Sequence, residues 1–279
     1  MKKSFLFLCG LTSFSVFAQT TTPNFKIQVV DNQINIGYGL AVGDVDGDKR
    51  LDILLADQKD IVWYKNEGTK NGESWKRHVM VSNVTPKDNV CIAARDIDGD
   101  GKVEVAIGAM WNPAETNDIT KSGAVFYLVR PEDPTQRWEP IPLHHEITTH
   151  RMRWAQVSKN KFQLIVVPLH GLGNANGEGK GVKVLAYDVP KNPKQPWPYQ
   201  LVDSTLHITH NFEIWEDADA TRILIGSKEG GKVVSYQKNQ WKPTGQWIGE
   251  GLGVGEVRRG YLPNKDAFVA AVAPWHGNQ

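Results

Sequence analysis

The sequence is poor in cysteine and nearly balanced in charge, and both features narrow what the protein can be. Its 279 residues include two cysteines, of which Cys9 precedes the expected processing site and only Cys91 follows it. The mature chain is therefore expected to contain no intramolecular disulfide. The net charge of +1 gives no reason to expect binding to nucleic acid or to an anionic membrane surface. Stability must come from core burial and from any metal ion that the chain holds.

Helical periodicity and the common catalytic motifs are also absent from the sequence. No segment keeps a 3.6-residue hydrophobic period, and no GxSxG elbow, HExxH, P-loop or dinucleotide fingerprint occurs. Cys91 lies in an apolar stretch, which argues against a cysteine nucleophile. With 10 Trp, 26 Gly and 40% hydrophobic residues, the composition favours a protein of strands and turns.

The first 18 residues are typical of a secretory signal peptide. Lys2 and Lys3 precede an apolar run from Phe5 to Phe17, and Ala18 ends a plausible cleavage site. A retained anchor helix is the alternative, but the apolar run is short for a bilayer span. We expect residues 1–18 to be removed and residues 19–279 to form one secreted or periplasmic domain without a membrane span.

Two copies of an acidic loop followed by an apolar strand indicate an internal repeat. DVDGDKRLDILLAD begins at Asp44, and DIDGDGKVEVAIGA begins at Asp96, 52 residues (96 − 44) later. Each repeat also has a tyrosine closing one apolar strand and a tryptophan opening the next. The tyrosines are Tyr64, Tyr127, Tyr187 and Tyr236, and the tryptophans are Trp75, Trp138, Trp197 and Trp241. Units of four short strands at this spacing are typical of propeller blades.

The fold class predicted from these repeats is an all-β propeller. Four complete blades are expected at 35–83, 89–146, 150–207 and 210–250, with a partial fifth from Gly251. A β-sandwich is the competing class, but a sandwich need not repeat Tyr and Trp at equivalent positions. Asn24 to Asp31 reads as an outermost strand. Closure of five small blades on themselves is the alternative; the prediction is the N-terminal part of a longer, seven-bladed propeller.

The two acidic loops have the donor spacing of calcium sites. Oxygen atoms recur at positions 1, 3, 5, 7 and 9, and hard donors of this kind suit Ca²⁺. An EF-hand is excluded because a strand follows each loop and position 12 is Leu55 or Ile107. An Asp-Gly turn without an ion is the plainer alternative. The predicted ligands are Asp44, Asp46, Asp48, the Arg50 carbonyl and Asp52 in the first loop, and Asp96, Asp98, Asp100, the Lys102 carbonyl and Glu104 in the second.

DVDGDKRLD and DIDGDGKVE resemble the FG-GAP or VCBS repeats of integrin-like propellers. The resemblance implies a propeller whose bound Ca²⁺ ions stiffen the blades, and it says little about activity.

Histidines fall at repeat-equivalent positions of the later blades. His150 and His210 stand at the start of the first strand of the third and fourth blades, whereas His170 and His276 follow the second strand of the third and fifth. Because both positions lie at one face of a propeller, these side chains are predicted to ring a mouth of the central channel. Neighbours expected to join them include Arg151, Arg153, Trp111 and Lys228. For any single histidine, a structural hydrogen-bonded role is the alternative.

Imidazole with arginine suits proton abstraction next to a carbonyl or carboxylate. Histidine clusters also bind Zn²⁺, which makes zinc a second candidate metal at this ring.

The segments HRMRW, VPLHGLGN, HNFE and APWHGNQ resemble the propeller of aldos-2-ulose (anhydrofructose) dehydratases. More distantly, the paired His150 and His170 resemble ulvan lyase propellers, which use two histidines and a tyrosine for β-elimination. The resemblance implies that His150 or His170 acts as base or acid and that Arg151 or Arg153 stabilises developing charge. His210 and His276 would bind metal or sugar hydroxyls.

The predicted function is therefore a secreted carbohydrate lyase or dehydratase that removes a proton from a keto-sugar or uronic-acid sugar. The alternative is a non-catalytic, calcium-binding FG-GAP module that binds a glycan or a protein.

Overall fold

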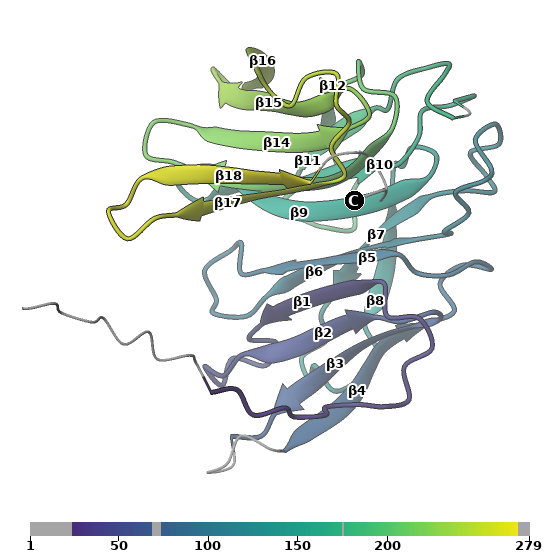
Figure 1. Cartoon of the computed structure of the whole chain (residues 1–279). Coiled ribbons are helices and arrows are strands. Elements are labelled where there is room, and N and C mark those ends of the chain that lie inside the picture. Colours follow the sequence, from purple (N-terminus) through teal and green to yellow (C-terminus); the bar gives the residue numbers. More distant parts are fainter. Residues whose placement is uncertain (1–23, 69–73, 175, 273–279) are drawn as a thin grey trace, which may run out of the picture.

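The chain is built from antiparallel strands joined by turns. The computed structural model describes residues 24–68, 74–174 and 176–272, and among these residues there is no helix. The strands form four sheets of four strands and one hairpin, and within each sheet consecutive strands pair with one another (Figure 1). None of the described segments is a helix long and apolar enough to cross a membrane.

Each sheet is one blade, and its first strand lies innermost. Blade 1 contains β1 (Gly39–Gly43), β2 (Asp52–Ala56), β3 (Asp60–Asn66) and β4 (Trp75–Ser82). Blade 2 contains β5 (Cys91–Arg95), β6 (Glu104–Ala109), β7 (Ala124–Val129) and β8 (Glu139–Leu143). Blade 3 contains β9 (Thr149–Ser158), β10 (Lys161–Pro168), β11 (Val184–Asp188) and β12 (Tyr199–Asp203). Blade 4 contains β13 (Thr209–Glu216), β14 (Thr221–Ser227), β15 (Gly230–Gln237) and β16 (Gln240–Ile248), and the described part of blade 5 contains β17 (Glu256–Tyr261) and β18 (Ala267–Val272).

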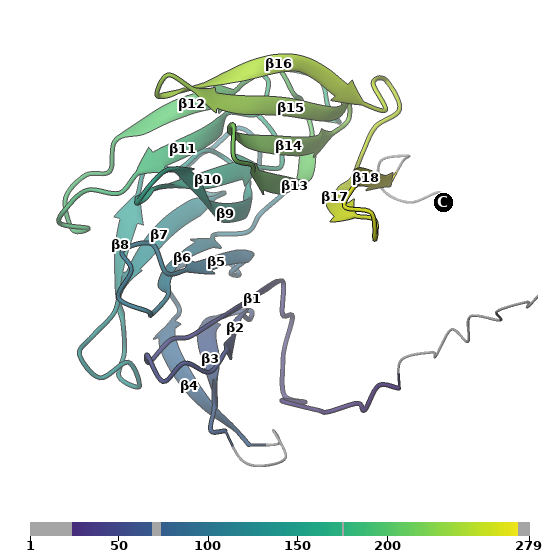
Figure 2. The ribbon, with the colours of Figure 1, turned by 90° about the vertical axis from the view of Figure 1, so that its left-hand side faces the viewer.

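The blades follow one another along an arc, with the innermost strands side by side (Figure 2). β1 packs beside β5, β5 beside β9, β9 beside β13, and β13 beside β17. The prediction of an all-β fold made of four-stranded propeller blades is confirmed, and the blade boundaries agree with those read from the repeats.

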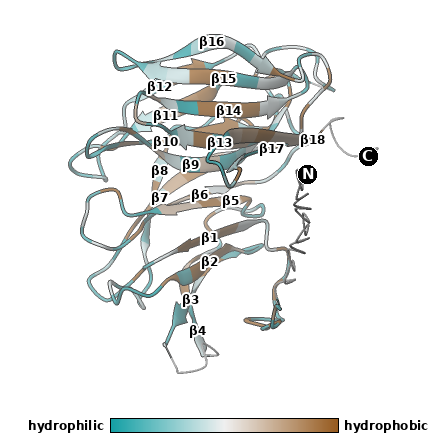
Figure 3. Cartoon of the chain, turned by 60° about the vertical axis from the view of Figure 1, so that its left-hand side comes forward, coloured by the Kyte–Doolittle hydropathy of each residue, from teal (hydrophilic) through white to brown (hydrophobic). Residues whose placement is uncertain are grey.

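The hydrophobic core lies between neighbouring blades rather than at one central point. Trp63 and Leu54 of blade 1 pack with Ile107 of blade 2, and a similar cluster joins each later pair of blades. Figure 3 shows apolar residues concentrated in the strands and polar residues in the connecting loops. Burying one such side chain contributes about 1.5–3 kcal/mol, so each blade depends on its neighbour for its core.

The repeated aromatic residues have equivalent structural places. The four tyrosines lie on the third strands, and the four tryptophans lie at or just before the fourth strands. Trp138 and Trp197 stabilise equivalent turns of blades 2 and 3. In each turn the indole Nε1 donates to the carbonyl of a proline four residues earlier, at 3.0 and 2.9 Å. Tyr127 then contacts Trp197 of the next blade, with ring centroids 5.1 Å apart.

The N-terminal segment differs from its prediction as a strand. Residues 24–29 have no strand conformation, and the side chains of Phe25, Ile27 and Val29 are exposed. A strand makes its backbone hydrogen bonds with a neighbouring strand, and the sheets formed by the described residues do not include this segment. The segment is instead anchored at its end, where the Tyr64 hydroxyl donates to the Asp31 carboxylate at 2.5 Å.

Candidate functional site

The first strands of blades 3 and 4 place two histidines next to each other. His150 and His210 are each the second residue of their strand, in β9 and β13. Their ring centroids lie 4.9 Å apart, and Trp111, which follows β6 of blade 2, stacks on His150 at 5.0 Å with an interplanar angle of 14°. Three rings from three blades thus form one group, called here the histidine cluster (Trp111, His150 and His210).

Contacts with the backbone hold two rings of the cluster in place. The His210 ring Nδ1 lies 2.9 Å from the Gly255 carbonyl at the start of blade 5. Trp111 forms a bridge with Asp88, just before β5. The predicted grouping of strand-start histidines at one face is therefore present for His150 and His210.

A half-buried arginine, Arg151, lies directly beside the cluster. The Arg151 Nε donates to Asn211 Oδ1 at 2.8 Å, and its Nη1 donates to the His150 carbonyl at 3.1 Å. Asn211 in turn donates to the Glu256 carboxylate of blade 5. Burial lowers the pKa of Arg151 from its usual value, but an arginine stays protonated at neutral pH. The site therefore contains a fixed positive charge.

Arg153 lies one inward-facing position further along β9. Its Nε donates to the Phe212 carbonyl at 3.1 Å, and its guanidinium lies 5.5 Å from the Phe212 ring centroid. Burial lowers the pKa of this arginine too. Arg153 and Glu213 line one pocket of about 210 Å³.

His170 lines a small cavity that His150 and His210 do not line. Its backbone amide donates to the Thr148 hydroxyl at 2.8 Å, and its side chain lines a small cavity of about 70 Å³ with Glu146 and Lys183. Burial lowers the pKa of His170 below its usual value. Its ring Nδ1 is buried and has no hydrogen-bond partner among the described residues. The prediction that His170 and His150 belong to one ring of side chains stays a prediction.

The remaining predicted site residues have mixed positions. Lys228 follows β14, and its Nζ donates to the Gly177 carbonyl at 3.3 Å. His276 lies outside the described residues. His78 and His144 lie outside the predicted site and stack on Trp63 and Tyr199, with ring centroids 4.9 and 4.4 Å apart.

The first acidic loop gathers three carboxylates between β1 and β2. One oxygen from each of Asp44, Asp46 and Asp48 lies within 4.8 Å of the others. Lys65 pairs with Asp46, and Arg50 pairs with Asp48. Asp52 lies outside this group because its two oxygens accept the amides of Val45 and Asn66, at 2.9 and 2.8 Å.

The second acidic loop, between β5 and β6, gathers Asp96, Asp98 and Glu104 within the same distance. Asp100 is turned toward Arg130, whose guanidinium lies 2.8 Å away and also 3.3 Å from Glu104. Burial raises the pKa of Glu104 to about 7 and that of Asp52 to about 6. A bound cation would favour the ionised forms.

The donor chemistry of both loops fits a hard cation. Each offers carboxylate oxygens on a short turn, as Ca²⁺ requires. Among the described residues, groups of three or more close metal ligands occur at these two loops and not at the histidine cluster. Zinc at the cluster would therefore need donors beyond the described part of the chain.

Comparison with known proteins agrees with this architecture. The family described as "Aldos-2-ulose dehydratase, beta-propeller domain" matches residues 122–279, more than half of the chain. The chain belongs to this family. An FG-GAP-like repeat matches residues 16–107. Integrin alpha-PS2 of Drosophila melanogaster is 26% identical over 181 residues, which cover 58% of this chain and 11% of the integrin.

The predicted calcium loops and the predicted catalytic residues lie in different family matches. Both acidic loops lie in the FG-GAP-like part. His150, His170, His210, Arg151 and Arg153 lie in the part that matches the dehydratase propeller. The resemblance to FG-GAP and dehydratase propellers inferred from the motifs is thus confirmed.

Sequence reasoning missed the acidic partners of the site. Glu256 binds Asn211 across the blade boundary, and Glu216 pairs with Arg95 of blade 2 at 2.5 Å. Charged residues alternate along the innermost strands, as Glu256 and Arg258 do in β17. This alternation could have indicated that acidic side chains face the same side as the arginines.

Proposed function

We propose that the histidine cluster belongs to a carbohydrate lyase site that eliminates water or an alkoxide from a keto-sugar or uronic-acid sugar. The observation that carries the proposal is the packing of His150 against His210 beside the half-buried, positively charged Arg151. Such a site holds a proton acceptor, a proton donor and a charge that stabilises an enolate.

The proposed reaction uses these groups in a defined order. A neutral imidazole removes the proton from the carbon next to the carbonyl or carboxylate, and the electron pair forms an enolate. The enolate then collapses to a carbon–carbon double bond while the β-oxygen leaves with a proton from the acid. Arg151, fixed by Asn211, stabilises the enolate oxygen, and Trp111 offers an apolar face for the sugar ring.

His150 and His210 are favoured as base and acid because their rings are in contact. His170 is proposed as a contributor from its adjoining cavity, since its lowered pKa keeps the ring neutral at working pH. Arg153, Lys228 and His276 are proposed to position the substrate. Zinc at the cluster, with His276 as a further ligand, remains part of the proposal.

The site is tested by separate His150→Ala and His170→Ala variants, assayed by the ultraviolet absorbance of unsaturated products from keto-sugars and uronic-acid polymers. Loss of a general acid or base is expected to lower kcat by about 10²–10⁴-fold. His144→Ala, which changes an exposed histidine just after β8, is the matched control and should keep full activity. Unchanged turnover by His150→Ala would remove the basis of the proposal.

Two acidic loops support calcium as the proposed structural metal, with ligands drawn from Asp44, Asp46 and Asp48 and from Asp96, Asp98 and Glu104. Export is proposed from the signal-like first 18 residues and from the FG-GAP-like match.

A non-catalytic calcium-binding module for a glycan or protein is the second candidate. The acidic loops and the integrin similarity favour it. Glycan binding that persists without any turnover, in a protein with an intact histidine cluster, would support this second function over the first.

A further inference from the structure

A larger cavity than the one beside His170 opens between blades 2 and 3. It lies at the opposite end of the strands from the histidine cluster. It has a volume of about 680 Å³, within the range of small-molecule sites. Its walls come from the acidic loop after β5, the β9–β10 hairpin and the end of β11. His150 lies at the start of β9, whereas Gln156 of this cavity lies near its end, so the cavity and the cluster are separate places.

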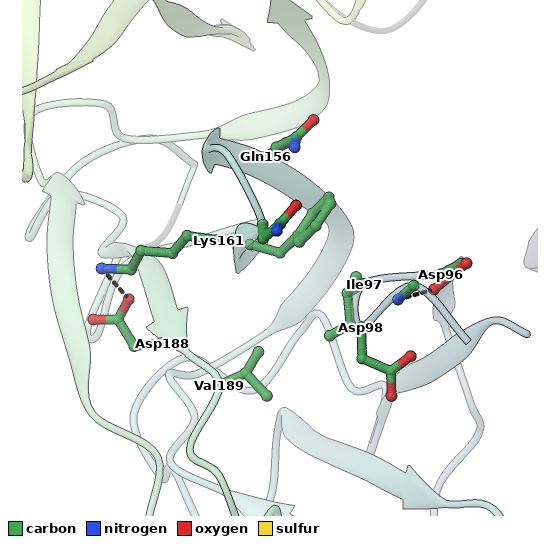
Figure 4. A pocket seen from close by; sticks show the side chains of 10 residues that line it. Asp96, Ile97, Asp98, Gln156, Lys161, Asp188 and Val189 are labelled. Atoms are coloured by element: carbon green, nitrogen blue, oxygen red, sulfur yellow. Dashed lines mark hydrogen bonds and ion pairs between the residues drawn. The ribbon is translucent and has the colours of Figure 1, made fainter. Parts of the chain in front are cut away.

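The cavity has two facing walls of mixed character. Ile97 and Asp98 lie on one side and Val189 and Asp188 on the other, with Lys161 reaching to Asp188 (Figure 4). The Lys161 ammonium is 3.2 Å from the Asp188 carboxylate. Apolar carbons, hydrogen-bond donors and hydrogen-bond acceptors therefore all line this cavity.

A half-buried aromatic ring, Phe162, also lines the cavity and is held in place from outside it. The Arg95 guanidinium lies 4.8 Å from the Phe162 ring centroid. Two hydrogen bonds of 2.5 and 2.9 Å fix this guanidinium to Glu216 of blade 4. The ring is thus ordered before any ligand arrives, which lowers the entropic cost of binding.

The carboxylates of the cavity are largely engaged already. The two Asp96 oxygens accept the amides of Gly99 and Gly101, at 2.7 and 3.0 Å. Asp188 accepts from Gln163 at 3.0 Å in addition to its pair with Lys161. Asp188 is already paired with Lys161, and Asp96 and Asp98 are proposed calcium ligands. The cavity therefore favours a neutral polar ligand over an organic cation such as a lysine side chain, which would have to compete for these carboxylates.

We infer that this cavity is a non-catalytic saccharide-binding site. A sugar ring has an apolar face that fits Phe162 and Val189, and hydroxyl groups that match Gln156, Lys161 and Asp188. The volume accommodates a short oligosaccharide. A lysine-rich peptide is the other ligand class suggested by the acidic residues, and the test below distinguishes the two.

The test measures binding of neutral trisaccharides (maltotriose, cellotriose, xylotriose and mannotriose) to the full chain by isothermal titration and saturation-transfer NMR. At least one should bind, and Phe162→Ala should weaken it about tenfold or more. Lys161→Met, a change at an exposed side chain that the fold tolerates, should weaken it also. Lys159→Met, in the same turn but outside the cavity, is the matched control and should bind normally.

His150→Ala separates this site from the proposed lyase site. Saccharide binding that survives His150→Ala but not Phe162→Ala supports the inference, whatever the outcome of the activity assays. Loss of all binding in His150→Ala together with normal binding in Phe162→Ala overturns it. Absence of binding by every trisaccharide, or binding of trilysine that Lys161→Met strengthens, overturns it as well.

Discussion

At the scale of single residues, Asp57 holds the segment before the first blade. Its carboxylate accepts the backbone amides of Asn35, Ile36 and Gly37, at 3.0, 2.8 and 3.2 Å. Burial raises the pKa of Asp57, but hydrogen bonds from Ile36, Gln58 and Asn35 outweigh this effect and leave the pKa below its usual value. The ionised carboxylate is therefore the form that the fold stabilises.

We expect Asp57→Ala to lower the free energy of unfolding by about 2 kcal/mol, since three amides lose a charged acceptor. Urea unfolding at neutral pH measures the change. Asp219→Ala, at an exposed aspartate paired with Arg222, should leave stability unaltered. Equal stability of Asp57→Ala and the wild type would refute the anchoring role.

The same residue predicts a pH dependence. Because the folded-state pKa is lowered, the stabilisation is present above the unfolded value of about 4 and is lost as pH falls through the folded value. The difference in unfolding free energy between wild type and Asp57→Asn should hold steady from neutral pH to about pH 5 and close below about pH 4. A difference that grows on acidification would contradict this assignment.

Residue patterns predicted some side-chain neighbours well and others poorly. His150 and His210 were predicted together because blade register alone sets their positions. His170 follows a strand at the same face and lines a small cavity with Glu146 and Lys183, and such local packing is not encoded by spacing. Lys65 and Arg130 reach the acidic loops from third strands or just beyond them, and no motif marks them.

At the scale of elements, the two acidic loops are expected to bind calcium independently. Asp44→Asn and Asp96→Asn should each remove one of two equivalents in a calcium titration. A ligand at a hundred times its Kd stabilises the folded state by about 2.7 kcal/mol per site, so calcium should raise the Tm of the wild type more than that of either variant. Asp133→Asn, at an exposed turn, is the control.

A chain whose Tm and titration do not respond to calcium would show that the loops are plain Asp-Gly turns.

Another element-scale prediction concerns the close approach of β1 and β5. A Cβ added at Gly39 would lie 2.9 Å from the Cys91 Cα and 3.1 Å from the Ile92 backbone nitrogen. Gly39→Ala should therefore separate the two innermost strands and cost about 1–3 kcal/mol of stability, measured by thermal or urea unfolding. Leu40→Ala, at the mostly exposed next position, should cost less. Similar losses in both variants would count against close packing as the cause.

At the scale of the whole molecule, the repeats allowed the class, order and limits of the blades to be predicted. They did not predict that residues 24–29 lack strand conformation. A strand assignment depends on a neighbouring strand to pair with as well as on apolar residues. Apolar side chains are exposed at both ends of the arc, including Leu40 and Val42 of β1 and Phe268 of β18. Further blades that cover them remain a prediction.

Repeat architectures contact mainly their nearest neighbours, so their blades tend to unfold in stages. The pair of Arg95 and Glu216 departs from that pattern, because it joins residues 121 positions apart in blades 2 and 4 across blade 3. Glu216 also accepts the Gln156 amide of blade 3 at 2.7 Å. One carboxylate thereby links three successive blades and should make their unfolding more cooperative. Glu216→Gln is expected to broaden the urea transition and to let blade 4 amides exchange hydrogen before those of blade 2, whereas the wild type should exchange them together.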